Sequence, residues 1–156
     1  MNTEEMEMVT ESEAPWMVHL DLMDLAIAKK NASAAVRAWR DAYAEAIGSA
    51  GWPGIIEVAA ACLRIGEIPG FRKACEAKAR ETYWTALFRA RQQGSFNGVL
   101  EAAHAFGVLG DRAMVEECIR IAGRLAAQEP DDRSADQVRA LSARLAERFL
   151  TEDTLR

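Results

Sequence analysis

One stretch of the chain recurs 44 residues downstream with its glycines, acids and small residues at the same positions. Residues 54–66 read GIIEVAAACLRIG, and residues 98–110 read GVLEAAHAFGVLG. A recurrence of roughly 20–50 residues is typical of repeat architectures, in which each unit buries its apolar face against the next. Repeat proteins usually present binding surfaces rather than catalytic centres. The recurrence therefore predicts a stacked repeat protein that works by binding.

The apolar pattern predicts helices and no sheet. Apolar residues recur at helical spacing throughout, and no segment alternates with a period of two over a useful length. We expect seven helices, over residues 15–30, 32–47, 53–65, 71–92, 95–109, 112–129 and 134–149. Asn31 is expected as a left-handed cap, Ser95 and Asp111 as N-caps, and Ser134 with Gln137 as a capping box.

Short connections between these helices favour hairpins, because a short turn returns the second helix alongside the first. The predicted fold is all-α: a right-handed stack of antiparallel helix hairpins, about three units, with a C-terminal capping helix. We expect an acidic, disordered tail over residues 1–12, a single helical-repeat domain over 13–150 and a short tail over 151–156.

Charge and composition exclude several classes of function. The net charge is −5, and five of the 24 acidic residues lie in residues 1–14, so the remainder has 19 acids against 19 bases. Nucleic-acid binders show a basic footprint, which is absent from this sequence. No stretch reaches the roughly 20 apolar residues that span a bilayer, and the acidic start does not resemble a signal peptide. We expect a cytoplasmic protein whose three cysteines are buried and reduced: Cys62, Cys75 and Cys118.

The units around the recurrence resemble tetratricopeptide repeats. The resemblance rests on small residues at helix-packing positions and on Gly-Glu or Gly-Asp turns: Val58, Ala59, Cys62, Gly66, Glu67, Phe71 and Cys75 in one unit, and Ala102, Ala103, Phe106, Gly110, Asp111, Val115, Ile119 and Ala122 in the next. The first hairpin carries it through Ala35, Trp39 and Ala42. The alternative is another right-handed hairpin stack; HEAT-like repeats have a period near 44 but lack this turn.

The spacing departs from that family, whose repeat is about 34 residues long. The turns near Asn31 and Gly66 are 35 residues apart, whereas those near Gly66 and Gly110 are 44 apart. We place the surplus of some nine residues in the helix over 71–92, which would be longer than a tetratricopeptide unit requires.

The resemblance implies a concave face lined by the first helix of each unit. The residues that it assigns to this face are Ile56, Ala60, Leu63 and Arg64 from the third helix, and Asn97, Leu100, His104 and Val108 from the fifth. The lysine-and-asparagine clamp with which some family members hold a C-terminal carboxylate is not present at these positions. The resemblance therefore implies an apolar helix or strand as the ligand of this face.

Two other groups of residues need an explanation. The bulky residues in the long fourth helix, which either pack in the core or form a surface for self-association as a homodimer, are Tyr83, Trp84, Leu87 and Phe88. Glu101 and His104 stand one turn apart, but a metal centre of the di-iron type needs more ligands than this pair supplies. We expect no metal and no cofactor.

The sequence contains no nucleophile elbow, phosphate-binding loop or other catalytic signature, so we expect no enzyme. The first hypothesis is a non-catalytic adaptor or scaffold module that binds another protein or peptide through its concave surface. The alternative is a sensor or regulatory domain for a small molecule or peptide, and an enzyme with an unrecognised site is a third. The acidic start is either a solvated tail or a segment that covers the groove.

Overall fold

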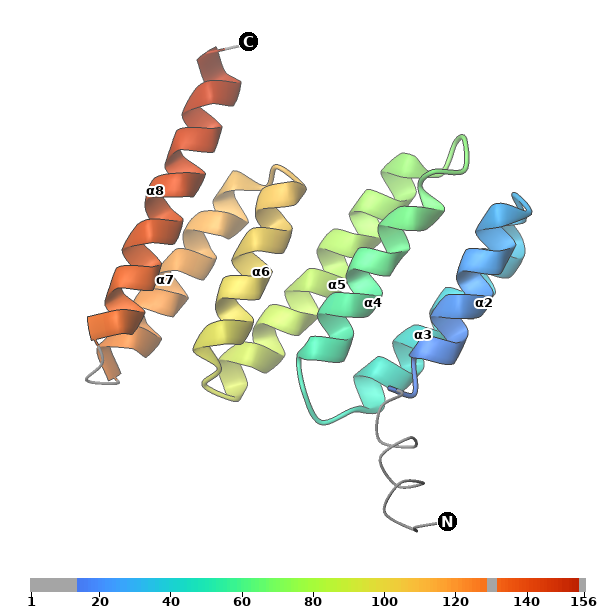
Figure 1. Ribbon diagram of the computed structural model, residues 1–156, viewed down its shortest axis with the longest axis horizontal. Helices are drawn as coiled ribbons and strands as arrows, with labels where there is room; N and C mark the ends of the chain where they lie inside the picture. Colours follow the sequence, from blue (N-terminus) through green and yellow to red (C-terminus); the bar gives the residue numbers. More distant parts are fainter. Residues whose placement is uncertain (1–13, 129–131, 155–156) are drawn as a thin grey trace, which may run out of the picture. The chain divides into compact units, whose positions relative to one another are not determined.

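The structure is a computed structural model that describes residues 14–128 and 132–154 (Figure 1). All regular secondary structure in these residues is helical, and no strand occurs among them. The helices are α2 (Met17–Ala28), α3 (Ala32–Gly48), α4 (Pro53–Ile65), α5 (Arg72–Gln92), α6 (Phe96–Val108), α7 (Arg112–Gln128) and α8 (Asp132–Thr154). For the residues that the structure describes, the prediction of an all-α fold with seven helices is confirmed. The acidic segment 1–12 lies outside the described residues.

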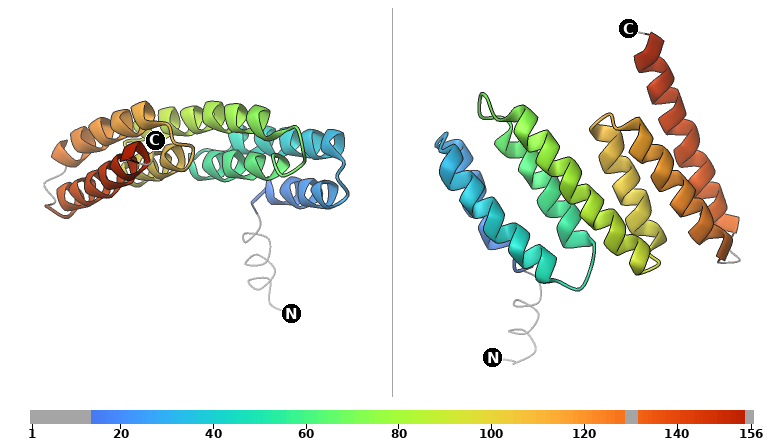
Figure 2. Two further views of the ribbon diagram at one scale, coloured as in Figure 1. Left: turned by 90° about the horizontal axis from the view of Figure 1, so that it is seen from above. Right: turned by 180° about the vertical axis from the view of Figure 1, so that it is seen from behind.

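The chain divides into two compact units, with the boundary after Ala79, inside α5. In the first unit α2 packs on α3, and α3 packs on α4 (Figure 2). In the second unit α6 packs on α7, and α7 packs on α8. Consecutive helices are therefore in contact within each unit, as a helical stack requires. Helix α8 continues to Thr154, past residue 150, where we expected the helical domain to end.

Two of the predicted helix caps are confirmed by hydrogen bonds to backbone amides. The Ser95 hydroxyl accepts from the Gly98 amide at 3.1 Å, and the Asp111 carboxylate accepts from the Met114 amide at 3.3 Å. Pro53 occupies the first turn of α4, where its missing N–H costs nothing. These side chains and this proline set the starts of three helices.

Two predicted caps are wrong. The left-handed residue after α2 is Lys30, with φ of 56°, rather than Asn31. Asn31 instead begins the next helix, since its side chain accepts from the Ala34 amide at 3.1 Å. Ser134 is not an N-cap, because α8 already begins at Asp132 and includes it.

The core of the first unit is built on small residues of α3 and aliphatic residues of α4. Ala35, Ala42 and Ala46 are fully buried, which lets the neighbouring helix axes approach closely. Trp39 is only 3% exposed, and its indole N–H donates to the Val58 carbonyl at 2.8 Å. The polar edge of this large ring is therefore satisfied inside the core.

Trp16 covers the start of α4. Its indole N–H donates to the Glu57 carboxylate at 2.8 Å. Its ring lies directly over Gly54, so closely that a Cβ on Gly54 would stand 2.7 Å from the nearest ring carbon. The glycine is needed here because the tryptophan occupies the space that any side chain would take.

The second unit is centred on Phe106, which is fully buried in α6. The Tyr83 ring meets the Phe106 ring edge-on, with centroids 6.0 Å apart. Gly107 faces Leu145 of α8, so that a Cβ added there would lie 3.1 Å from a leucine methyl. Helix α8 therefore packs closely on the small surface that Gly107 provides.

Many positions of the 44-residue recurrence have the same burial in both copies, although Ala61 is buried and Ala105 half-buried, and Leu63 is half-buried and Gly107 buried. The buried positions pair as Gly54 with Gly98, Ile55 with Val99, Val58 with Ala102, Ala59 with Ala103 and Cys62 with Phe106. The exposed positions pair as Glu57 with Glu101, Ala60 with His104 and Arg64 with Val108. The recurrence therefore marks two structurally equivalent helices, α4 and α6.

Helices α3, α5 and α7 repeat with a different spacing, which was not among the sequence predictions. Helices α3, α5 and α7 begin at residues 32, 72 and 112, a constant step of 40. Buried positions recur at the same step: Ala35, Cys75 and Val115; Ala42, Thr82 and Ala122; Ala46, Ala86 and Ala126. We placed the whole surplus of some nine residues in α5, but only part of it lies there. Helix α5 has 21 residues, four more than the 17 of α3 and of α7. The connection 66–71 before it is also longer than the connection 109–111.

Candidate functional site

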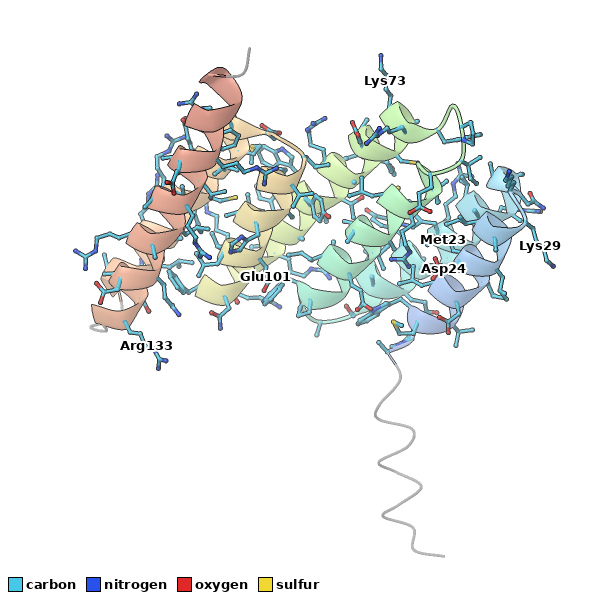
Figure 3. All side chains as sticks on the ribbon, turned by 45° about the horizontal axis from the view of Figure 1, so that its top comes forward. Met23, Asp24, Lys29, Lys73, Glu101 and Arg133 are labelled. Atoms are coloured by element: carbon cyan, nitrogen blue, oxygen red, sulfur yellow. The ribbon has the colours of Figure 1, made fainter. Side chains whose placement is uncertain are left out.

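The residues assigned to the binding face of α4 lie on its less buried side. Ala60 and Arg64 are exposed, and Ile56 and Leu63 are half-buried. Arg64 does not extend freely into solvent, because its guanidinium contacts the Asp24 carboxylate of α2 with Nε and Oδ1 2.9 Å apart. Figure 3 labels Asp24 on α2. The α4 face is thus an apolar strip ending in an ion pair.

The corresponding residues of α6 have a similar distribution of exposure. Asn97, His104 and Val108 are exposed, and Leu100 is half-buried. Val108 is 67% exposed, a high value for an aliphatic side chain. Packing within the second unit does not explain why this apolar side chain is exposed.

Glu101 and His104 are both exposed on α6, and Figure 3 shows Glu101 at the surface of that helix. Among residues 14–128 and 132–154, no group of three or more His, Cys, Asp and Glu side chains is arranged to hold a metal ion. Glu101 and His104 lie on the same helix as the exposed Val108 and add polar groups to the exposed side of α6.

The four bulky residues of α5 divide between core and surface. Tyr83 and Leu87 are 4% and 3% exposed, so they belong to the core of the second unit. Trp84 and Phe88 are 37% and 50% exposed, and their rings contact each other with centroids 5.2 Å apart. The accessible part of the predicted self-association surface is this aromatic pair.

The first unit also contains a pocket that the sequence analysis did not predict. It has a volume of about 330 Å³, and we call it the α3–α5 pocket. One wall is a stripe of α3, the other is the start of α5 with the residue before it, and α4 forms the floor. The lining residues are Val36, Trp39, Arg40 and Tyr43; Phe71, Ala74, Cys75 and Lys78; and Cys62 and Ile65.

The floor of the α3–α5 pocket is apolar and uncharged. The Cys62 thiol donates weakly to the Cys75 carbonyl at 3.9 Å. Burial raises the pKa of Cys62 to about 12, and burial also raises the pKa of Cys75. Both sulfurs are therefore protonated at neutral pH and act as small hydrophobic groups. All three cysteines are free and buried, as predicted.

No helix in the described part of the chain is long and apolar enough to span a membrane. Comparison with models of known protein families gave no match, and no curated protein matches the chain. The functional argument therefore rests on the geometry of the chain itself.

A second recurrence in the sequence involves the residues of the pocket. The 40-residue step of α3, α5 and α7 is visible in the sequence, since Arg40-x-x-Tyr43-x-x-Ala46 recurs as Arg80-x-x-Tyr83-x-x-Ala86. Alignment at that step shows which pocket residues differ from their counterparts 40 residues later in the chain. The 44-residue recurrence relates only α4 to α6, so it does not align the residues of α3 and α5 that line most of the pocket.

Proposed function

We propose that this protein is a non-catalytic adaptor that binds another protein or peptide through the exposed faces of α4 and α6. The observation that carries this proposal is the matched exposure of the two helices. At equivalent positions, Ala60 with His104 and Arg64 with Val108, both helices leave side chains accessible, whereas Val58, Ala59, Ala102 and Ala103 are buried. Repeat proteins use such equivalent positions to build an extended binding surface.

The proposal also covers the direction of the helices and the handedness of their stack. We take the helix pairs to be antiparallel hairpins in a right-handed, tetratricopeptide-like stack, in which α4 and α6 would line the concave face. Small residues at the packing positions, the constant step of 40 residues between α3, α5 and α7, and the 44-residue recurrence between α4 and α6 support this arrangement. The half-buried Ile56, Leu63 and Leu100 suit an apolar helix or strand as the ligand, in a cytoplasmic setting.

The test is a comparison of two sets of surface variants in binding to the natural partner, isolated first by affinity capture. Alanine substitutions at Leu63, Leu100 and His104 should weaken binding by at least about tenfold, because binding energy concentrates in a few central contacts. Alanine substitutions at Arg37 and Glu45, exposed on α3, are the control and should change binding little. Equal affinity of both variant sets and the unmodified protein would exclude this face.

Arg64 needs separate treatment, because its ion pair with Asp24 gives it a second role. Both side chains are about half exposed, so breaking the pair should change stability by at most about 1 kcal/mol. Asp24→Ala breaks the same pair without removing the guanidinium. A binding defect in Arg64→Ala but not in Asp24→Ala would assign the arginine to the partner.

We also propose that the protein forms a weak homodimer through the aromatic pair of α5. In an antiparallel pairing of two α5 helices about a twofold axis, Trp84 of one copy would meet Phe88 of the other. Glu81 and Arg91 each stand three residues outside the aromatic pair, so the same axis would bring opposite charges together. This self-complementarity of aromatic and charged residues supports a second copy of the chain as the occupant.

A charge exchange tests the dimer. Glu81→Arg and Arg91→Glu should each weaken dimerisation in sedimentation velocity experiments, because each places like charges opposite one another. The double variant should restore dimerisation, since the charges are then reversed together. A protein that stays monomeric at millimolar concentration, or single variants that dimerise as well as the unmodified chain, would exclude the pairing.

The α3–α5 pocket favours a second function, a sensor or regulatory domain for a small molecule. Its volume of about 330 Å³ lies at the lower end of the range of roughly 300–1,000 Å³ for ligand pockets. An apolar lining with a few charged groups at the rim is the usual composition of such sites. A thermal-shift screen in which ligands stabilise the unmodified chain but not a pocket-filling variant tests this function.

A further inference from the structure

The α3–α5 pocket has an equivalent region in the second unit, and the comparison shows why the first one is open. The 40-residue step relates α3 to α5 and α5 to α7, and the 44-residue step relates α4 to α6. Two lining residues are identical in both places: Arg40 corresponds to Arg80, and Tyr43 corresponds to Tyr83. The differences therefore lie in the residues around a shared arginine and tyrosine.

In the second unit larger side chains fill the equivalent space. Cys62 corresponds to Phe106, which is fully buried with its ring 6.0 Å from that of Tyr83. Ala74 corresponds to Met114, which is also buried. A thiol and a methyl group in the first unit thus replace a phenyl ring and a thioether chain. This loss of volume leaves the cavity at the α3–α5 pocket.

The shared arginine has a carboxylate partner in only one of the two places. Arg80 Nε lies 3.1 Å from Asp111 Oδ2, the residue immediately before α7. The equivalent residue before α5 is Phe71, which cannot accept a hydrogen bond from Arg40. Among the residues that the structure describes, no carboxylate pairs with Arg40. The guanidinium at the rim of the pocket is therefore available to an external anion.

One exchange adds volume and an aromatic ring to the lining of the pocket. Trp39 stands where the other groove has Ala79, and its ring is fixed by the hydrogen bond to the Val58 carbonyl. The Tyr43 ring stacks on it, with centroids 5.4 Å apart and planes at 27°. Two aromatic rings held against each other in the lining suit an aromatic ligand, which can contact them without reorganisation.

We propose that the α3–α5 pocket binds a small aromatic monocarboxylate. Its ring would lie against Trp39 and Tyr43, above the floor formed by Cys62, and its carboxylate would take the place that Asp111 has beside Arg80. Lys78, on the opposite wall, adds a second cation at the rim. The proposal rests on the second proposed function, that of a ligand-sensing domain.

The uncharged floor is compatible with this ligand. Because both thiols remain protonated at neutral pH, no negative charge inside the pocket repels a carboxylate. A carboxylate bound by a guanidinium makes hydrogen bonds about twice as strong as those between neutral groups. The charge should therefore distinguish an acid from a neutral ligand of the same shape.

The test uses 2-naphthoate and its neutral analogue 2-naphthamide as probes, titrated into the full chain by calorimetry. We expect naphthoate to bind about tenfold more tightly than naphthamide. Ala74→Met, which copies Met114, should weaken both probes by at least about tenfold, and Ala74→Ser is the matched control that leaves the space open. Arg40→Gln should remove the preference for the acid while naphthamide binding persists.

The possible results separate the ligand class from the sensor function. If both probes bind equally and Ala74→Met weakens both, the pocket is a sensor site but the carboxylate assignment is overturned. If a tripeptide ending in phenylalanine binds where naphthoate does not, the pocket takes a protein C-terminus and the proposal is overturned. If neither probe binds and no ligand in a thermal-shift screen loses its effect in Ala74→Met, both the ligand class and the sensor function fail.

Discussion

The contact between Trp16 and Gly54 allows a substitution to be predicted with its sign. A methyl group on Gly54 would lie 2.7–2.9 Å from three carbons of the Trp16 ring. Such distances are too short for carbon atoms, so the ring must move away from α4. Moving it also breaks the hydrogen bond of 2.8 Å between the Trp16 indole and Glu57. Gly54→Ala should therefore destabilise the protein.

The magnitude follows from opposing terms. Overpacking of a closely packed site costs about 1–3 kcal/mol. Alanine in place of glycine in a helix gains at most about 1 kcal/mol, and less in the first turn, where Gly54 lies. We expect a net loss of about 1–2 kcal/mol in the free energy of unfolding. For a chain of this size that corresponds to a fall in Tm of about 2–8 °C.

Urea denaturation followed by circular dichroism measures this change, with Gly123→Ala as the matched control. Gly123 lies in α7 and has no atom within 4 Å of an added Cβ, so alanine there should stabilise by about 0.5–1 kcal/mol. In a Trp16→Ala background, Gly54→Ala should no longer destabilise. If Gly54→Ala is as stable as the unmodified chain with Trp16 present, the reasoning about this contact is refuted.

Three further predictions concern caps, charges and a buried thiol. Ser95→Ala should cost about 1 kcal/mol of stability in the same assay, whereas Ser134→Ala, inside α8, should cost less than about 0.5 kcal/mol; equal losses would contradict the caps described above. Asp111→Ala should lose about 1 kcal/mol for the cap and at most about another 1 kcal/mol for the partly exposed pair with Arg80, while Asp111→Asn should lose only the second part; an asparagine variant as unstable as the alanine variant would contradict that division. Burial raises the pKa of Cys118 from 9.0 to about 12, so the unfolded thiol ionises first and the free energy of unfolding falls as pH rises from 9 towards 12. Cys118→Ala should flatten this slope by about 1.4 kcal/mol per pH unit, and an unchanged slope would contradict the burial effect.

The helices could be predicted because their signals are local. Pro53, Ser95 and Asp111 each act within one turn of their own position, by a fixed φ or by a hydrogen bond to a nearby amide. The burial of Trp39 also follows from its place on the apolar stripe of α3. The prediction for the end of α2 was wrong, because Lys30 adopts the left-handed backbone conformation. Asparagine adopts this conformation more readily than lysine, so Asn31 was expected there.

The α3–α5 pocket depends on contacts between helices, which the apolar pattern does not specify. Cys62 and Ala74 look like ordinary small packing residues until their counterparts Phe106 and Met114 are aligned with them. Likewise, the helical pattern of α5 could not separate buried Tyr83 from exposed Trp84, because both lie within an almost continuous run of bulky residues. Which of these residues faces solvent is decided by the packing of neighbouring helices.

Site-specific photocrosslinking tests most directly whether α4 and α6 bind the partner. A photoreactive phenylalanine analogue at Ala60 or His104, the equivalent exposed positions of the two helices, would be compared with the same group at Ala44, exposed on α3. We predict that Ala60 and His104 variants crosslink to the same partner in the native cell and that the Ala44 variant does not. A partner that crosslinks equally at Ala44, or at neither Ala60 nor His104, would contradict the proposed binding surface.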